Sequence, residues 1–313
     1  MKYAVYVRWP WAGDGFVVGA TQPSSANTGV PAGTTLATLL GDQTITTAGT
    51  VIENKRIEGR VLVQTSGVVL RNCEIVGTTA IFENAATTVV GLVECFGTGR
   101  SVTLERCTLR PQQPSPCIDG VRGWNITATR CDISCVTDGF GIIPPSGSLN
   151  SGVTIRGCYV HHHSFFTQAG WRAQIGSSTA LVHPSDTSTH NDGIQIHGGS
   201  NTTLEGNFFC ANSAYSLGVG QSPNAADRVN VGVQLDVAGS LGPINSTSIQ
   251  YNWFDYGYAG QIQAAPAEAI ASTVISGNRF TSNNASSIEI RMNSLGWSGS
   301  GNTLDGTGTP RSN

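Results

Sequence analysis

A short unit recurs along this chain of 313 residues, and it constrains the fold more than any other feature of the sequence. Each unit has an aliphatic residue, two mostly polar positions, a cysteine or asparagine anchor, and an apolar residue two places after the anchor. Examples are GVVLRNCEI, SVTLERCTL and STSIQYNWF. The anchors are Cys73, Cys107, Cys131, Cys158, Asn207, Asn252 and Asn278. A repeat of this kind predicts stacked copies of one structural unit, each contacting its neighbours.

The alternation of apolar and polar positions predicts a strand, a sharp corner near the anchor, and a second short strand. Intervals between anchors range from 24 residues (Cys107 to Cys131) to 49 residues (Cys158 to Asn207), so the longer turns contain insertions. A propeller blade would need about 40 residues and four strands. We therefore predict an all-β solenoid of about nine coils.

The composition agrees with a solenoid and excludes several classes of protein. The chain has 39 Gly, only 12% charged residues and a net charge of -3, so it offers no basic surface for phosphates, which excludes a nucleic-acid binder. No stretch approaches the roughly 18 to 20 apolar residues of a membrane span, so we expect no membrane insertion. Arg8, Pro10 and Asp14 interrupt the first twenty residues, so we expect no secretory leader.

The anchors explain four of the eight cysteines. Residues in the same register on successive coils stack about 4.8 Å apart. Asparagine there can form an amide ladder, and cysteine fills a similar small volume as a buried thiol. We expect reduced structural thiols and no zinc site, which implies assembly in a reducing cytoplasm.

Three Asp-Gly pairs, at Asp119, Asp138 and Asp192, fall on consecutive predicted coils. If these aspartates stack, neighbouring carboxylates are about 5 Å apart and alternate ones about 10 Å, separations that bracket those of glycosidase carboxylate pairs. The alternative is a structural turn, because Gly readily adopts a positive φ after Asp. Catalysis and turn formation both remain open for these residues.

A second set of polar residues is predicted to point outward along one strip of the solenoid. Ile194 and Ile196 alternate with Gln195 and are expected inside. The candidate sugar-binding residues are His190, Gln195, His197, Gln234, Asp236, Glu289 and Arg291. The alternative is an ordinary solvated sheet face. His161 to His163 open the longest insertion, and we expect a hydrogen-bonding loop base there rather than a metal site; no cofactor is predicted.

With this repeat, the chain resembles the right-handed parallel β-helix proteins, the pectate-lyase-like architecture of polysaccharide lyases, glycosidases and phage tailspikes. The polygalacturonase motifs N-T-D, D-D, G-H-G and R-I-K are not reproduced beyond Asn191 and Asp192. The expected layout is an N-terminal β-hairpin arm at 1–25, a linker and cap at 26–44, the β-helix at 45–305 and a tail at 306–313.

The resemblance implies a tail or tailspike-like protein on the surface of a phage virion, assembled in the host cytoplasm. Its expected partners are other virion proteins, bound through the N-terminal arm, and host cell-surface polysaccharide, with a homotrimer as the assembly. The alternative is a polysaccharide lyase or glycoside hydrolase that acts through the three aspartates.

Overall fold

The computed structural model describes residues 16–77, 89–145, 151–166, 189–210, 231–236, 241–255, 260–264, 270–280, 290–292 and 297–304. Within these ranges the chain forms strands and no α-helix, so no helix there has the length and apolar character to cross a membrane. Three long sheets, here called A, B and C, contain all the strands.

Sheet A, with ten strands, consists of β1 (Ala37–Leu40), β4 (Lys55–Glu58), β7 (Glu74–Ile75), β10 (Thr108–Leu109), β13 (Asp132–Ser134), β16 (Tyr159–His161), β19 (Phe208–Cys210), β22 (Trp253–Asp255), β26 (Arg279–Phe280) and β29 (Thr303–Leu304). Sheet B, with nine, consists of β2 (Gln43–Ile45), β5 (Val61–Val63), β8 (Val90–Cys95), β11 (Ile118–Gly123), β14 (Phe140–Ile142), β17 (Asp192–Ile196), β20 (Val231–Leu235), β23 (Gly260–Ala264) and β27 (Ile290–Arg291). Sheet C, with ten, consists of β3 (Val51–Glu53), β6 (Val68–Arg71), β9 (Val102–Glu105), β12 (Ile126–Thr129), β15 (Val153–Arg156), β18 (Gly199–Glu205), β21 (Ile244–Gln250), β24 (Ile270–Ala271), β25 (Thr273–Ser276) and β28 (Trp297–Ser298).

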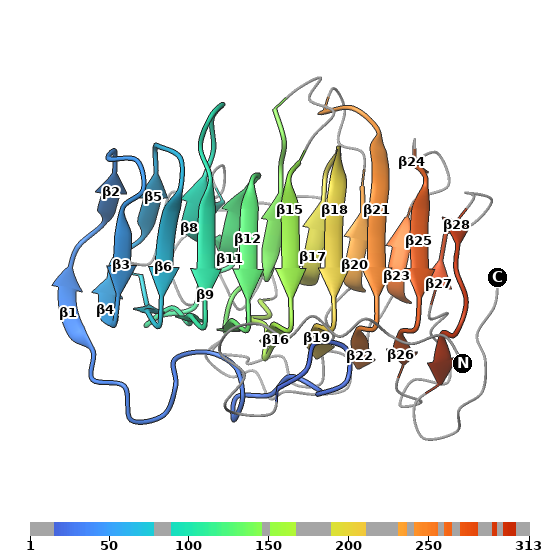
Figure 1. Ribbon diagram of the computed structural model, residues 1–313, viewed down its shortest axis with the longest axis horizontal. Helices are drawn as coiled ribbons and strands as arrows, with labels where there is room; N and C mark the ends of the chain where they lie inside the picture. The colour runs from blue at the N-terminus through green and yellow to red at the C-terminus, as the bar shows by residue number, and fades with distance from the viewer. Residues whose placement is uncertain are drawn as a thin grey trace.

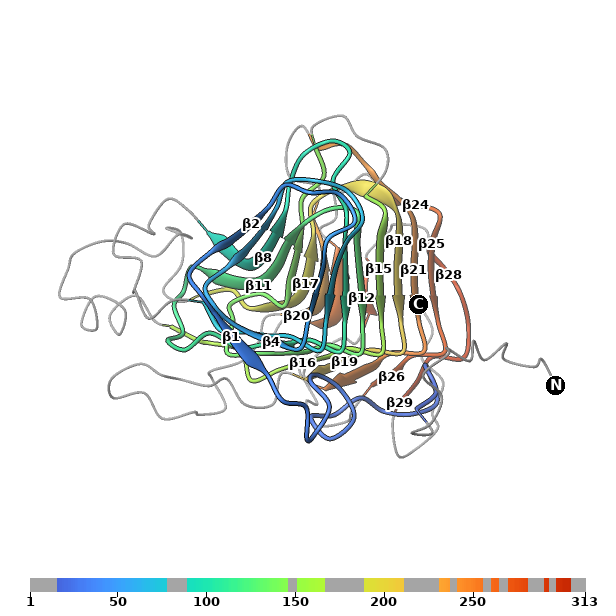
Figure 2. The same ribbon diagram turned by 60° about the vertical axis from the view of Figure 1, so that its left-hand side comes forward.

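The chain visits sheets A, B and C in turn, and every strand pairs in parallel with its counterpart on the next coil, as β11 does with β14 (Figure 1). Sheet B contributes one strand to each coil, so the described residues form nine coils. The turned view separates the three faces of the solenoid (Figure 2). The predicted right-handed parallel β-helix of about nine coils is confirmed.

Stacked inward side chains fill the interior of the helix. Ile194 pairs with Val233 on the next coil, and both are fully buried. The rings of Phe209, Phe254 and Phe280 stack on successive coils with centroids 5.4 and 5.2 Å apart. Burial of large apolar side chains contributes about 1.5–3 kcal/mol each, so these columns supply the main stabilisation.

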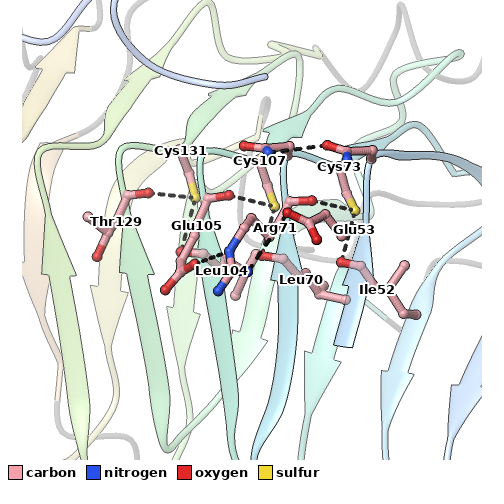
Figure 3. A network of polar contacts seen from close by, with 12 residues as sticks. Ile52, Glu53, Leu70, Arg71, Cys73, Leu104, Glu105, Cys107, Thr129 and Cys131 are labelled. Carbon is pink, nitrogen blue, oxygen red and sulfur yellow. Dashed lines mark hydrogen bonds and ion pairs between the residues drawn. The ribbon is translucent and has the colours of Figure 1, made fainter. Parts of the chain in front are cut away.

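The corner between sheets C and A gives the repeat its signature. The residue before each anchor has a left-handed backbone, as at Asn72, with φ 50°, and Arg106, with φ 52°. The Cys107 thiol donates to the Leu70 carbonyl of the previous coil, at 3.3 Å (Figure 3). All eight cysteines are free and buried, as predicted.

The asparagine anchors make the same contact with an amide. Asn252 Nδ2 donates to the Leu204 carbonyl of the previous coil at 3.0 Å, and its Oδ1 accepts the Asn207 backbone N–H at 2.9 Å. Asn302 extends this ladder by accepting the backbone N–H of Asn278 at 3.1 Å. Cysteine and asparagine therefore occupy the same register because each donates to the equivalent carbonyl of its previous coil.

The N-terminal segment lies along the coils. Residues 1–15 of the predicted hairpin arm lie outside the described residues. The next residues of that arm form a turn and no strand, because Thr21 donates its backbone N–H to the Val17 carbonyl. Further on, Gly29 donates to the Arg130 carbonyl, at 2.8 Å, and the Phe16 ring lies 4.3 Å from the Arg130 guanidinium.

This segment passes beneath β16, β19 and β22 (Figure 1). Sheet strands β1 and β2 already form within the predicted linker at 26–44, so the first coil begins at Ala37. The predicted tail at 306–313 lies outside the described residues.

Candidate functional site

The three aspartates lie one behind another where the chain enters sheet B. Asp119 is in β11, Asp138 lies two residues before the start of β14, and Asp192 begins β17. The glycine after each is needed for packing: a Cβ on Gly139 would lie 2.4 Å from both the Gly193 carbonyl oxygen and a methyl of the core. Each Asp-Gly pair therefore lies where the backbone passes so close to the interior of the β-helix that only glycine fits after the aspartate.

Each aspartate accepts a backbone N–H from the following coil. Asp119 Oδ1 accepts from Asp138 at 3.2 Å, and Asp138 Oδ1 accepts from Asp192 at 2.8 Å. Asp192 Oδ1 accepts from Val231 at 3.2 Å. The three residues are only 4, 7 and 2% exposed, respectively. This geometry is a ladder of side-chain-to-backbone hydrogen bonds. It differs from the positive-φ turn that the sequence offered as the alternative to catalysis, because Gly120, Gly139 and Gly193 do not have a positive φ.

Burial dominates the electrostatics of this ladder. Burial raises the pKa of Asp119 to about 6, although the Arg122 guanidinium, whose Nε lies 3.2 Å from Asp119 Oδ2, favours the ionised form. Burial also raises the pKa of Asp138 well above its ordinary value, and the neighbouring charges of Asp119 and Asp192 add to the shift. A raised pKa suits a general acid, but such an acid must also reach the proton acceptor on a substrate. These side chains offer almost no surface for that contact.

The outward strip of sheet B is a column of glutamines. Gln195 pairs with Gln234 on the next coil, and Gln234 pairs with Gln263 on the one after it. Gln263 Nε2 donates to Gln234 Oε1 at 2.9 Å. We call Gln195, Gln234 and Gln263 the amide column. Its outward direction follows from the full burial of the alternating residues Ile194 and Ile196, as predicted.

Gln263 was missed by the sequence reasoning. The stretch Gly260–Ala264 repeats the alternation of apolar residues with glutamine seen around Gln195, and that pattern was the available signal. Its position in β23 completes a coil between Gln234 and Arg291, whose backbone pairs with that of Gln263.

Only some of the other predicted binding residues contact this column. Asp236 Oδ2 lies 3.5 Å from Gln195 Nε2 and 3.9 Å from His197 Nδ1, so these three form one polar group at its edge. His190 is exposed and precedes β17, while Glu289 lies outside the described residues.

The histidine run is tied into the corner that follows β16. His161 Nε2 lies 2.8 Å from Asp132 Oδ1, and its ring stacks on that of Tyr159 with centroids 3.9 Å apart. His163 Nδ1 lies 2.8 Å from the Thr137 carbonyl, and burial lowers the pKa of this histidine to about 4. In the described part of the chain, His, Cys, Asp and Glu side chains form no group of three or more that could hold a metal ion. These contacts fit a hydrogen-bonded loop base.

A scan against protein-family models finds no match, and a search of curated proteins finds no similar sequence. The fold assignment therefore rests on strand order and register, and a fold alone does not assign an activity.

Proposed function

We propose that this chain is a structural, glycan-binding β-helix of a phage particle and that the amide column is its binding face. The observation that carries the proposal is the contrast between two rows on sheet B. The aspartates are buried and bonded to backbone N–H groups, whereas Gln195 and Gln263 are only partly buried; Gln234, between them, is 9% exposed. Carboxamides donate and accept hydrogen bonds, which suits sugar hydroxyls.

The virion setting is supported by the resemblance to tailspikes and by the buried free thiols, which suit assembly in a reducing host cytoplasm. In this proposal the protein is a homotrimer at the virion surface that contacts other virion proteins through its N-terminal residues. Analytical ultracentrifugation of the full chain should give the mass of an oligomer of three chains. A monomer at micromolar concentration would count against the trimer.

The second candidate is a polysaccharide lyase or glycoside hydrolase. The raised pKa of Asp138 favours it, since a protonated carboxyl is what a general acid requires. The 7% exposure of that side chain weighs against it. Release of reducing ends from bound glycan distinguishes this enzyme from a binding protein.

The amide column can be tested by binding of the full chain to purified host cell-wall polysaccharide. Removing one hydrogen-bonding side chain is worth about 0.5–1.5 kcal/mol, so Gln195→Ala and Gln263→Ala should each weaken binding by about two- to tenfold. The matched control is Gln250→Ala, an outward glutamine of sheet C whose Nε2 donates to Ser276 Oγ at 3.0 Å. If all three variants bind as the unaltered chain does, the amide column is not the binding face.

A further inference from the structure

A hollow of about 260 Å³ lies over the outer side of sheet A, away from both rows on sheet B. Its lining comes from successive coils: Arg56 from β4, Glu74 from β7, and Arg110 directly after β10. The remaining lining residues are Val76, Pro111, Gln112, Pro114 and Cys135. The sequence repeat does not predict this cavity.

The lining of the hollow carries two guanidinium groups, Arg56 and Arg110, and one carboxylate, Glu74. Arg56 is balanced, because its guanidinium contacts Glu74 and also lies 3.1 Å from Glu58 Oε1. Arg110 is exposed, and no carboxylate within the described ranges forms an ion pair with it. The Arg110 side chain also hydrogen-bonds the Cys135 thiol, and the remaining N–H groups of its exposed guanidinium can donate to an outside anion.

The rest of the lining has a restricted conformation. It adds no negative charge to that of Glu74. Pro111 and Pro114 are buried, and proline has a fixed φ. Cys135 is 4% exposed and has a left-handed backbone with φ 59°. Burial raises the pKa of its thiol, which keeps that group neutral at pH 7. The exposed Gln112 supplies an amide at the rim.

We propose that this hollow binds the anionic group of a single acidic sugar unit, with Arg110 as the main contact and Gln112 as a second donor. A guanidinium pairs with the two oxygens of a carboxylate or phosphate in a fork, which gives both direction and strength. The volume is just below the roughly 300–1,000 Å³ of ordinary ligand pockets, so it suits one unit rather than a chain. The inference rests on the proposed function only in assigning the anion to a glycan.

The experiment is isothermal titration of the full chain with three small probes in low-salt buffer. Glucuronate carries a carboxylate, glycerol phosphate carries a phosphate, and glucose is the neutral control. We expect at least one anion to bind, glucose not to bind, and Arg110→Gln to weaken anion binding at least tenfold. Arg279→Gln is the matched control, because Arg279 is an exposed arginine of sheet A that lies over the Trp253 ring at 5.1 Å. It should leave affinity unchanged.

Binding of glucuronate alone identifies a carboxylate source, and binding of glycerol phosphate alone identifies a phosphate source. The proposal is overturned if neither anion binds at millimolar concentration, if glucose binds equally well, or if Arg110→Gln has no effect. Because these probes do not need the amide column, anion binding can succeed while polysaccharide binding fails, and the reverse. The two proposals therefore fail separately.

Discussion

Replacing Asp138 with asparagine is expected to stabilise the protein at pH 7. The carboxyl is 7% exposed, and burial together with the charges of Asp119 and Asp192 raises its pKa well above 3.8. At pH 7 the unfolded chain ionises this group, whereas burial in the folded chain disfavours the ionised form. Protonating a carboxyl of pKa 3.8 at pH 7 costs about 4 kcal/mol at 1.36 kcal/mol per pKa unit. That value is the upper limit of the gain in unfolding free energy.

Asparagine keeps the contact that matters for the fold. Its Oδ1 can still accept the Asp192 backbone N–H, which lies 2.8 Å from Asp138 Oδ1. The charge of the Asp138 carboxyl destabilises the folded chain, whereas its Oδ1 stabilises the chain through the hydrogen bond of the ladder. Asparagine removes the charge and keeps the hydrogen bond.

The pH dependence has a definite sign. A group whose pKa is raised on folding gives stability that is fully present below its unfolded pKa and is lost as the pH rises through its folded pKa. The unaltered chain should thus lose up to about 1.4 kcal/mol per pH unit through Asp138 alone as the pH rises above about 4. Asp119, with a pKa of about 6, adds a loss of the same sign between about pH 4 and pH 6.

The assay is guanidinium unfolding of both chains at pH 5 and pH 7, with unfolding free energies from linear extrapolation. Asp138→Asn should be the more stable chain at pH 7, and its advantage should shrink at pH 5. The control is Asp42→Asn, because Asp42 is a surface carboxylate 3.0 Å from the Arg60 guanidinium and should gain nothing at either pH. A loss of more than about 1 kcal/mol in Asp138→Asn at pH 7 would show that the carboxylate is ionised and needed.

Three further outcomes are expected. Asn252→Ala should cost about 3 kcal/mol in denaturant unfolding, because it leaves the Leu204 carbonyl and the Asn207 N–H buried without partners, whereas Asn252→Cys should cost about 1 kcal/mol because the thiol can make the same contacts. Gly139→Ala should destabilise the fold by about 3 kcal/mol in the same assay, since its Cβ would lie 2.4 Å from the Gly193 carbonyl oxygen; an unchanged midpoint would refute this packing. A thiol reagent should label no cysteine in the folded chain and all eight in guanidinium, and rapid labelling under native conditions would contradict their burial.

The coil register could be predicted from the sequence because every coil must meet the same corner constraint. Cys107 and Asn252 differ in chemistry, yet each donates to a carbonyl of the coil before it. That contact repeats with the chain, so the anchors are visible as a pattern. The inward positions of Ile194 and Ile196 follow from the same alternation.

The state of the aspartates could not be predicted, because an Asp-Gly pair looks the same whether its carboxylate faces solvent or a backbone N–H. The difference depends on what lies across from Asp138, which is the Asp192 backbone of a coil 54 residues away in sequence. The hollow beside Arg110 could not be predicted either, because Pro111 and Cys135 lie in connections after the ends of β10 and β13, outside the repeating strand pattern. Gln263 was missed because its strand gives a weaker pattern: Ala264 stands where the strand of Gln234 has Leu235.

The central claim is that sheet B binds glycan without cutting it. The most direct measurement incubates the full chain with purified host cell-wall polysaccharide and follows bound glycan, reducing ends and glycan size together. We predict saturable binding with no new reducing ends and no change in glycan size, for both the unaltered chain and Asp138→Asn. Shortened glycan produced by the unaltered chain, and lost in Asp138→Asn, would contradict the account and identify an enzyme.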